Sequence, residues 1–123
     1  MPRKMAYCPS AVRGAVTRTT PTAKGIDVTV TATDPEAART IVALAELHAR
    51  FPRSLIPFPG HFGLRSGGSR IGFCPIVHED TSIKTTRVPD GVRIRLRARS
   101  PERVRELQTL VEERAARLRS PSS

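Results

Sequence analysis

Gly25-Ile26-Asp27-Val28-Thr29-Val30-Thr31-Ala32 and Gly91-Val92-Arg93-Ile94-Arg95-Leu96-Arg97-Ala98 are the two stretches that decide the fold of this chain. In both stretches an apolar residue alternates with a polar one, which is typical of a β-strand with one buried face and one open face. The two stretches also occupy equivalent positions of an internal repeat. We therefore predict two half-buried strands, one in each half of the chain.

The repeat extends well beyond these strands, at an offset of 66 residues. Cys8-Pro9 aligns with Cys74-Pro75, and 12 of the 44 pairs that start from Cys8 and end at Phe51 are identical. A duplicated unit usually buries its apolar face against its neighbour. We therefore expect one domain over residues 1–123, with repeats at 7–51 and 73–118, a Pro/Gly-rich connection at 52–72, and flexible tails at 1–6 and 119–123.

Each repeat is predicted to fold as strand, strand, helix. The first has strands at 12–20 and 26–33, and Asp34-Pro35-Glu36 provides an N-cap, a first-turn proline and an acid for a helix that Pro52 ends. The second has strands at 76–88 and 92–98, and Ser100-Pro101-Glu102 starts its helix in the same way. The predicted fold class is α+β, in which tandem ββα units form one four-stranded antiparallel sheet with two helices on one face.

The chain is strongly basic, with 21 Lys and Arg against 11 Asp and Glu and a net charge of +10. Nearly all of the cations are arginine, which binds phosphate and carboxylate groups in a bidentate manner. No apolar segment near the start resembles a signal peptide, and no stretch is long enough to span a membrane. The expected location is cytoplasmic, without a membrane partner.

The polar face of the last strand carries a row of arginines. Strand periodicity places Arg93, Arg95, Arg97 and Arg99 on one side at a spacing of about 7 Å, and Lys84 and Arg18 are placed to widen the patch. The outer faces contain no aromatic residue for base stacking, so we expect phosphate contacts with little sequence specificity. Nucleic acid or another polyanion is the leading partner. A solvated face and a docking surface for a protein partner or a second copy are the alternatives.

Cysteine and histidine residues suggest a second function. In the predicted topology His48, His61, Cys74 and His78 gather at one end of the sheet, a set that suits Zn, Cu or haem iron. Cys8 falls at the opposite end, too far from Cys74 for a disulfide. The competing interpretation is that both cysteines are small buried residues at strand entrances and that no cofactor binds.

We find no sequence motif for catalysis. Gly67-Gly68-Ser69-Arg70 lacks the strand and helix that flank a phosphate loop, and His78, Glu79 and Asp80 are neighbours on a strand that would point to opposite faces. The sequence therefore predicts a small, non-enzymatic, basic binding protein. Its alternatives are a metal- or haem-binding module and a subunit of a protein assembly.

Overall fold

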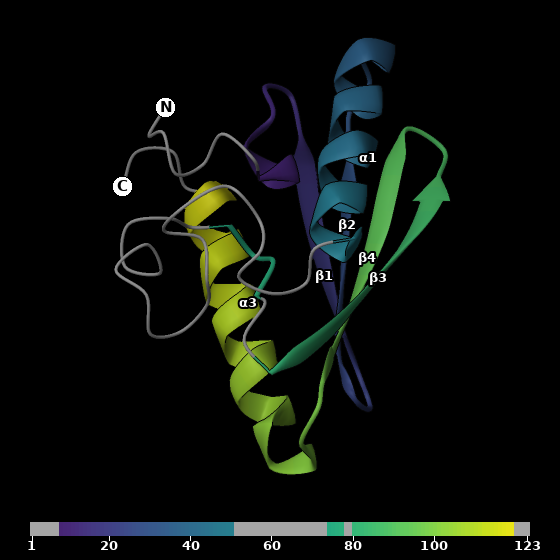
Figure 1. Ribbon diagram of the computed structural model, residues 1–123. Helices are drawn as coiled ribbons and strands as arrows, with labels where there is room; N and C mark the ends of the chain where they lie inside the picture. The colour runs from purple at the N-terminus through teal and green to yellow at the C-terminus, as the bar shows by residue number, and fades with distance from the viewer. Residues whose placement is uncertain (1–7, 51–73, 78–79, 120–123) are drawn as a thin grey trace.

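The computed structural model describes residues 8–50, 74–77 and 80–119. They form the predicted α+β fold, a four-stranded antiparallel sheet with two helices packed on it (Figure 1). The first unit contains η2 (Pro9–Ala11), β1 (Val16–Thr22), β2 (Gly25–Thr31) and α1 (Pro35–Arg50), and the second contains β3 (Thr81–Val88), β4 (Gly91–Ala98), η3 (Pro101–Arg103) and α3 (Val104–Arg119). The connection at 52–72, the tail at 1–6 and residues 120–123 lie outside the described residues. The second tail was predicted from residue 119, but α3 includes Arg119.

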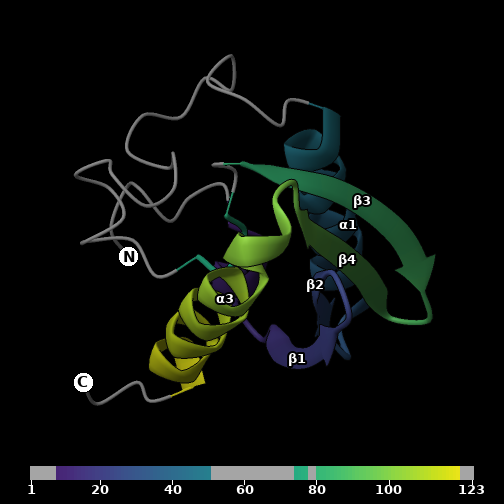
Figure 2. The same ribbon diagram turned by 90° about the horizontal axis from the view of Figure 1, so that it is seen from below.

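The strand order β1-β2-β4-β3 places the two alternating strands at the centre of the sheet (Figure 2). In the β2–β4 ladder Val28 pairs with Ile94, its own repeat equivalent. Two equivalent residues can pair in this way only if a pseudo-twofold axis passes between them. The same axis relates the pair Gly25–Arg97 to the pair Thr31–Gly91.

The core lies between the sheet and the helices. Ile26, Val28 and Val30 from β2 and Val92, Ile94 and Leu96 from β4 are fully buried. α1 packs mainly against β3 and β4, whereas α3 packs mainly against β1 and β2. Each helix therefore covers the hairpin of the other unit. Every fully buried Val, Leu or Ile side chain contributes about 2 kcal/mol to stability. Neither unit keeps this contribution alone, because the helix that buries its hairpin belongs to the other unit.

The two helices begin differently although their start signals look alike. The Asp34 carboxylate accepts a hydrogen bond from the Ala37 amide at 2.9 Å, as expected of an N-cap. Ser100 makes no such cap, and its hydroxyl instead donates to Asp80 at 3.3 Å. Helical structure does begin after Ser100, as predicted, but its first turn is the 3-10 turn η3 without a side-chain cap, and α3 follows from Val104.

The outer strands also begin later than predicted. The first was expected from residue 12 and the third from residue 76, but β1 starts at Val16 and β3 at Thr81. Before β1 the chain makes the 3-10 turn η2 and then passes through Gly14 at φ +86°. Residues 9–15 after Cys8 and the described residues 75–77 after Cys74 are thus not part of the sheet.

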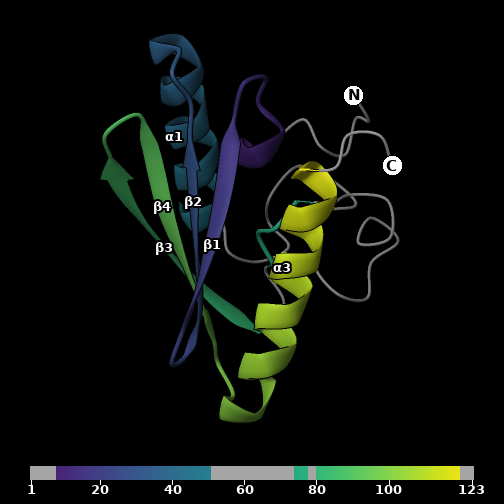
Figure 3. The same cartoon turned by 180° about the vertical axis from the view of Figure 1, so that it is seen from behind.

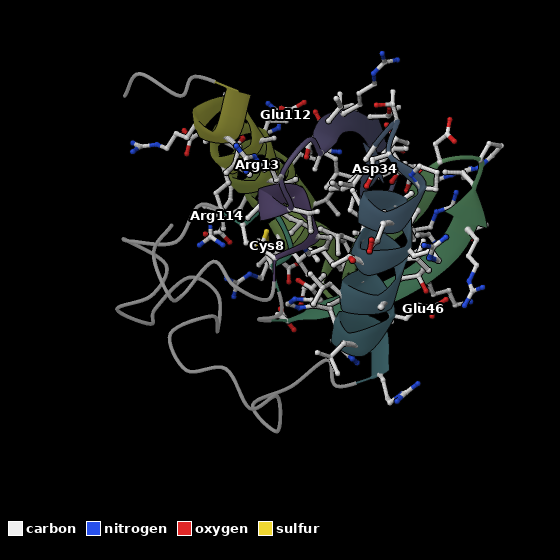
Figure 4. The ribbon with its side chains drawn as sticks, turned by 90° about the horizontal axis from the view of Figure 1, so that it is seen from above. Cys8, Arg13, Asp34, Glu46, Glu112 and Arg114 are labelled. Atoms are coloured by element: carbon white, nitrogen blue, oxygen red, sulfur yellow. A yellow bond between two sulfur atoms is a disulfide. The ribbon has the colours of Figure 1, made fainter. Side chains whose placement is uncertain are left out.

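Those segments bring the two cysteines together. Cys8 and Cys74 form a disulfide with Cα atoms 5.6 Å apart, and both are 1% exposed. The prediction that they lie too far apart to bridge is wrong, because it placed each cysteine at the end of a strand. Two equivalent residues that touch must lie on the pseudo-twofold axis, and Figure 4 shows Cys8 between the two helices.

Candidate nucleic-acid interface

The face of the sheet opposite the helices is polar and basic. Because Val92, Ile94 and Leu96 are buried, the residues that alternate with them point away from the helices. Arg93 and Arg97 are exposed, and Arg95 is partly exposed. In the view from behind, the central strands lie in front of α1 with this face toward the viewer (Figure 3). We refer to the surface formed by β1, β2, β4 and β3 on this side as the outer face.

The register adds the two flanking cations to the same face. On β3 Lys84 pairs with Arg95, and on β1 Arg18 pairs with Thr29, which in turn pairs with Arg93 on β4. Arg18 and Lys84 are repeat equivalents and both are exposed. Neighbouring strands lie about 4.8 Å apart, so the cations form a two-dimensional patch rather than a single row.

One acidic residue interrupts this patch. Asp27 lies directly across from Arg95, and its carboxylate accepts hydrogen bonds from Arg95 Nε at 3.1 Å and Nη2 at 3.4 Å. This bond raises the pKa of Arg95 further above its ordinary value. Arg95, which was predicted to be one of four equivalent cations, is therefore already engaged with a carboxylate, and the free positive charge lies around it.

Arg99 lies just beyond the end of β4. Its side chain is exposed, and its backbone amide donates to the Asp80 carbonyl at 2.9 Å. It extends the arginine series past the last paired residue of the strand.

Hydroxyl groups occupy much of the rest of the outer face. The alternation places on it Thr20, Thr29, Ser82 and Thr86. Hydroxyl side chains donate hydrogen bonds to phosphate oxygens in nucleic-acid complexes. The predicted patch included only cations, although strand alternation alone also places these hydroxyl groups beside the arginines. Tyr7 and all four Phe lie outside the described residues.

The proposed metal ligands are only partly placed. Cys74 is bonded to Cys8 and in this form has no thiolate to offer, and His61 and His78 fall outside the described residues. His48 is fully buried. Over residues 8–50, 74–77 and 80–119 no group of three His, Cys, Asp or Glu side chains is arranged to hold a metal ion.

Arg114, the repeat equivalent of His48, contacts the disulfide segment. It is 7% exposed, and its Nη1 donates to the Cys74 carbonyl at 3.0 Å. Burial lowers the pKa of its guanidinium. This arginine belongs to the interior of the fold and not to the outer face, so it adds nothing to the basic patch.

The described helices are all too short or too polar to cross a membrane. Comparison of the chain with protein-family models, curated proteins and solved structures finds no match.

Proposed function

We propose that this protein binds the phosphate backbone of nucleic acid through the outer face, with little dependence on sequence. The observation that carries the proposal is the balance of charge on that face. Among the described residues, one carboxylate, Asp27, faces the cations there, and it is bonded to Arg95. On this face Arg18, Lys84, Arg93 and Arg97 have no ion-pair partner among the described residues.

The chemistry of the face favours backbone contacts over base recognition. Guanidinium groups bind phosphate oxygens in a bidentate manner, and the neighbouring hydroxyls supply further donors. Binding of this type releases condensed counterions, so the logarithm of the affinity falls with the logarithm of the salt concentration by about 0.7 for each phosphate neutralised on a single strand. We therefore expect strong salt dependence and similar affinities for unrelated sequences.

The first test reverses two charges on the outer face. Arg93→Glu/Arg97→Glu should weaken binding to a fluorescein-labelled single-stranded DNA by at least about tenfold at low salt, because two phosphate contacts become repulsive. Fluorescence anisotropy over a salt series measures both the affinity and its salt slope. The matched control is Arg39→Glu/Arg105→Glu, which changes the net charge equally on exposed positions of α1 and α3. Equal losses in the two variants would show that only net charge matters and would refute an outer-face site.

The second test releases Arg95. Asp27→Asn removes the carboxylate that holds its guanidinium, so the affinity for the same DNA should rise about threefold, with a steeper salt slope, because one more cation meets phosphate. The control is Glu112→Gln, an equal change of charge on an exposed position of α3. An unchanged or lower affinity in Asp27→Asn would place the binding site away from Arg95.

The cellular location is a separate proposal. A cytoplasmic location was expected from the sequence, but the Cys8–Cys74 disulfide argues against a reducing compartment, where protein thiols are usually kept reduced. The redox state of the two cysteines in cells, trapped by alkylation before lysis, separates the two locations. If both cysteines are alkylated, they were free thiols, which supports a cytoplasmic location. If neither is alkylated, they were joined in the disulfide, which supports an oxidising compartment.

A further inference from the structure

A groove opens on the helix side of the molecule, away from the outer face. It lies between α1 and the β3–β4 hairpin and has a volume of about 400 Å³. Its apolar wall is formed by Ala38, Val42, Ala43 and Val88, and Arg39, Asp90 and Gly91 also line it. The groove thus combines an aliphatic surface with polar groups and the backbone of a hairpin turn.

The pseudo-twofold axis relates this groove to a place that the chain fills itself. In the other half, α3 lies against the β1–β2 hairpin, and Gln108 reaches from the helix to the turn. Its Nε2 donates to the carbonyl of Thr22 at 2.9 Å and to the carbonyl of Gly25 at 2.9 Å. Both protons of that carboxamide are therefore used to join the helix to the hairpin.

The equivalent residues of the groove cannot make this connection. At the repeat offset, Gln108 corresponds to Val42, and the acceptors Thr22 and Gly25 correspond to Val88 and Gly91. All three equivalents line the groove. A valine side chain has no N–H group to donate and is too short to reach the turn. By the pseudo-twofold axis, the groove therefore corresponds to the place that the Gln108 carboxamide occupies in the other half of the molecule.

The charges around the groove balance, with Arg39 and Arg87 against Glu46 and Asp90, and this balance favours a neutral ligand. Arg87 donates to Glu46 through Nε at 3.0 Å and Nη2 at 3.2 Å, which satisfies both charges and holds the pKa of Glu46 below its ordinary value. The exposed Arg39 guanidinium has no ion-pair partner among the described residues, so it offers N–H donors at the groove. The N–H groups of Arg39 on one wall and the carbonyls of the β3–β4 turn on the other are complementary to a ligand group that both accepts and donates hydrogen bonds.

We propose that this groove binds a primary carboxamide on a short aliphatic chain, as in the side chain of a glutamine exposed on a partner polypeptide. The amide N–H groups donate to the carbonyls of Val88 and Gly91, as Gln108 donates in the other half. The amide oxygen accepts from Arg39, and the aliphatic carbons lie against Val42 and Ala43. This binding site is independent of the outer face and of any nucleic-acid ligand.

The first experiment titrates the full chain with butyramide and follows the backbone amide resonances by NMR. 2-Pentanone is the matched probe, because it replaces the amide nitrogen by a methyl group at nearly constant shape. We expect saturable shifts at Val88 and Gly91 with butyramide and at least fivefold weaker binding of 2-pentanone. Equal binding of the two probes, or no shift at these residues, would overturn the proposal.

The second experiment exchanges the residues of the two halves. Val42→Gln should fill the groove from within and abolish the butyramide shifts, whereas the control Ala116→Gln, which adds the same side chain at an exposed position of α3 outside the groove, should retain them. Gln108→Val should open the equivalent place and produce a second set of shifts at Thr22 and Gly25. Undiminished shifts in Val42→Gln would overturn the proposal. So would the absence of new shifts in folded Gln108→Val, which tests the proposal even if Val42→Gln does not fold.

Discussion

Loss of the Cys8–Cys74 disulfide is expected to lower the free energy of unfolding by about 4 kcal/mol. The bond joins residues 66 positions apart, and in the chain-entropy model a loop of that length restricts the unfolded chain by about this amount. The measurement is urea denaturation of the oxidised protein beside the Cys8→Ala/Cys74→Ala variant, with the oxidised state of the parent checked by thiol titration.

Chemical reduction of the unmodified protein provides the control for this prediction. It removes the same cross-link without changing a core side chain, so the reduced protein should lose nearly as much stability as the double variant. Because both cysteines are buried at the pseudo-twofold axis, reduction should also require partial unfolding or denaturant. Thiols that titrate fully in the native, unreduced protein would contradict the disulfide and with it the loss of stability.

Alanine at Gly91 is the second substitution with a large expected effect. A Cβ atom at Gly91 would overlap the carbonyl oxygen of Val30 on the neighbouring central strand, and a Cβ at Gly25 would overlap that of Leu96 in the same way. Backbone atoms cannot move aside as a flexible side chain does, so the β2–β4 pairing itself must shift. We expect Gly91→Ala and Gly25→Ala each to destabilise the protein by about 3 kcal/mol.

Gly14 serves as a control that distinguishes the steric crowding at Gly91 and Gly25 from the loss of the conformational freedom of glycine. Its φ is +86°, but an added Cβ there would meet no atom within 4 Å. Gly14→Ala should therefore cost only the strain of the left-handed conformation, about 1 kcal/mol. Thermal and urea denaturation of the three variants gives the comparison. If Gly91→Ala were no less stable than Gly14→Ala, the close approach of β2 and β4 would be disproved.

The same symmetry explains why these glycines recur in both repeats. The axis between Val28 and Ile94 places Gly25 and Gly91 at equivalent ends of the central strand pair. Each follows a hairpin turn and lies against the backbone of the opposite central strand. The identity at these two positions therefore reflects one steric requirement that the fold imposes twice.

Much of the architecture was predictable because it depends on local patterns. Alternation in Ile26–Ala32 and Val92–Ala98 identifies the central strands and their buried faces, since side chains of a strand point alternately to its two sides. Asp34 and Pro35 mark the start of α1 because an N-cap acceptor and a first-turn proline act within a few residues. The repeat predicts two equivalent units in one sheet. The position of the arginines on the outer face follows from the same alternation.

Other features depend on which residues the pseudo-twofold axis brings together, and local patterns do not contain that information. The pairing of β2 with β4 decides that Asp27 faces Arg95, although the two residues are not repeat equivalents. Cys8 and Cys74 meet outside the sheet, where Cys8 precedes the 3-10 turn η2 and Cys74 precedes residues 75–77, which belong to no strand.

The sequence by itself determined the ββα units, the buried faces of the central strands and the sidedness of the arginines, because each depends on contacts between near neighbours in the chain. Only the tertiary structure decided the disulfide, the Asp27–Arg95 pair and the difference between the half that Gln108 fills and the half where Val42 leaves a groove. These depend on strand register and on the packing of each helix over the other unit's hairpin. Both are properties of the folded chain as a whole.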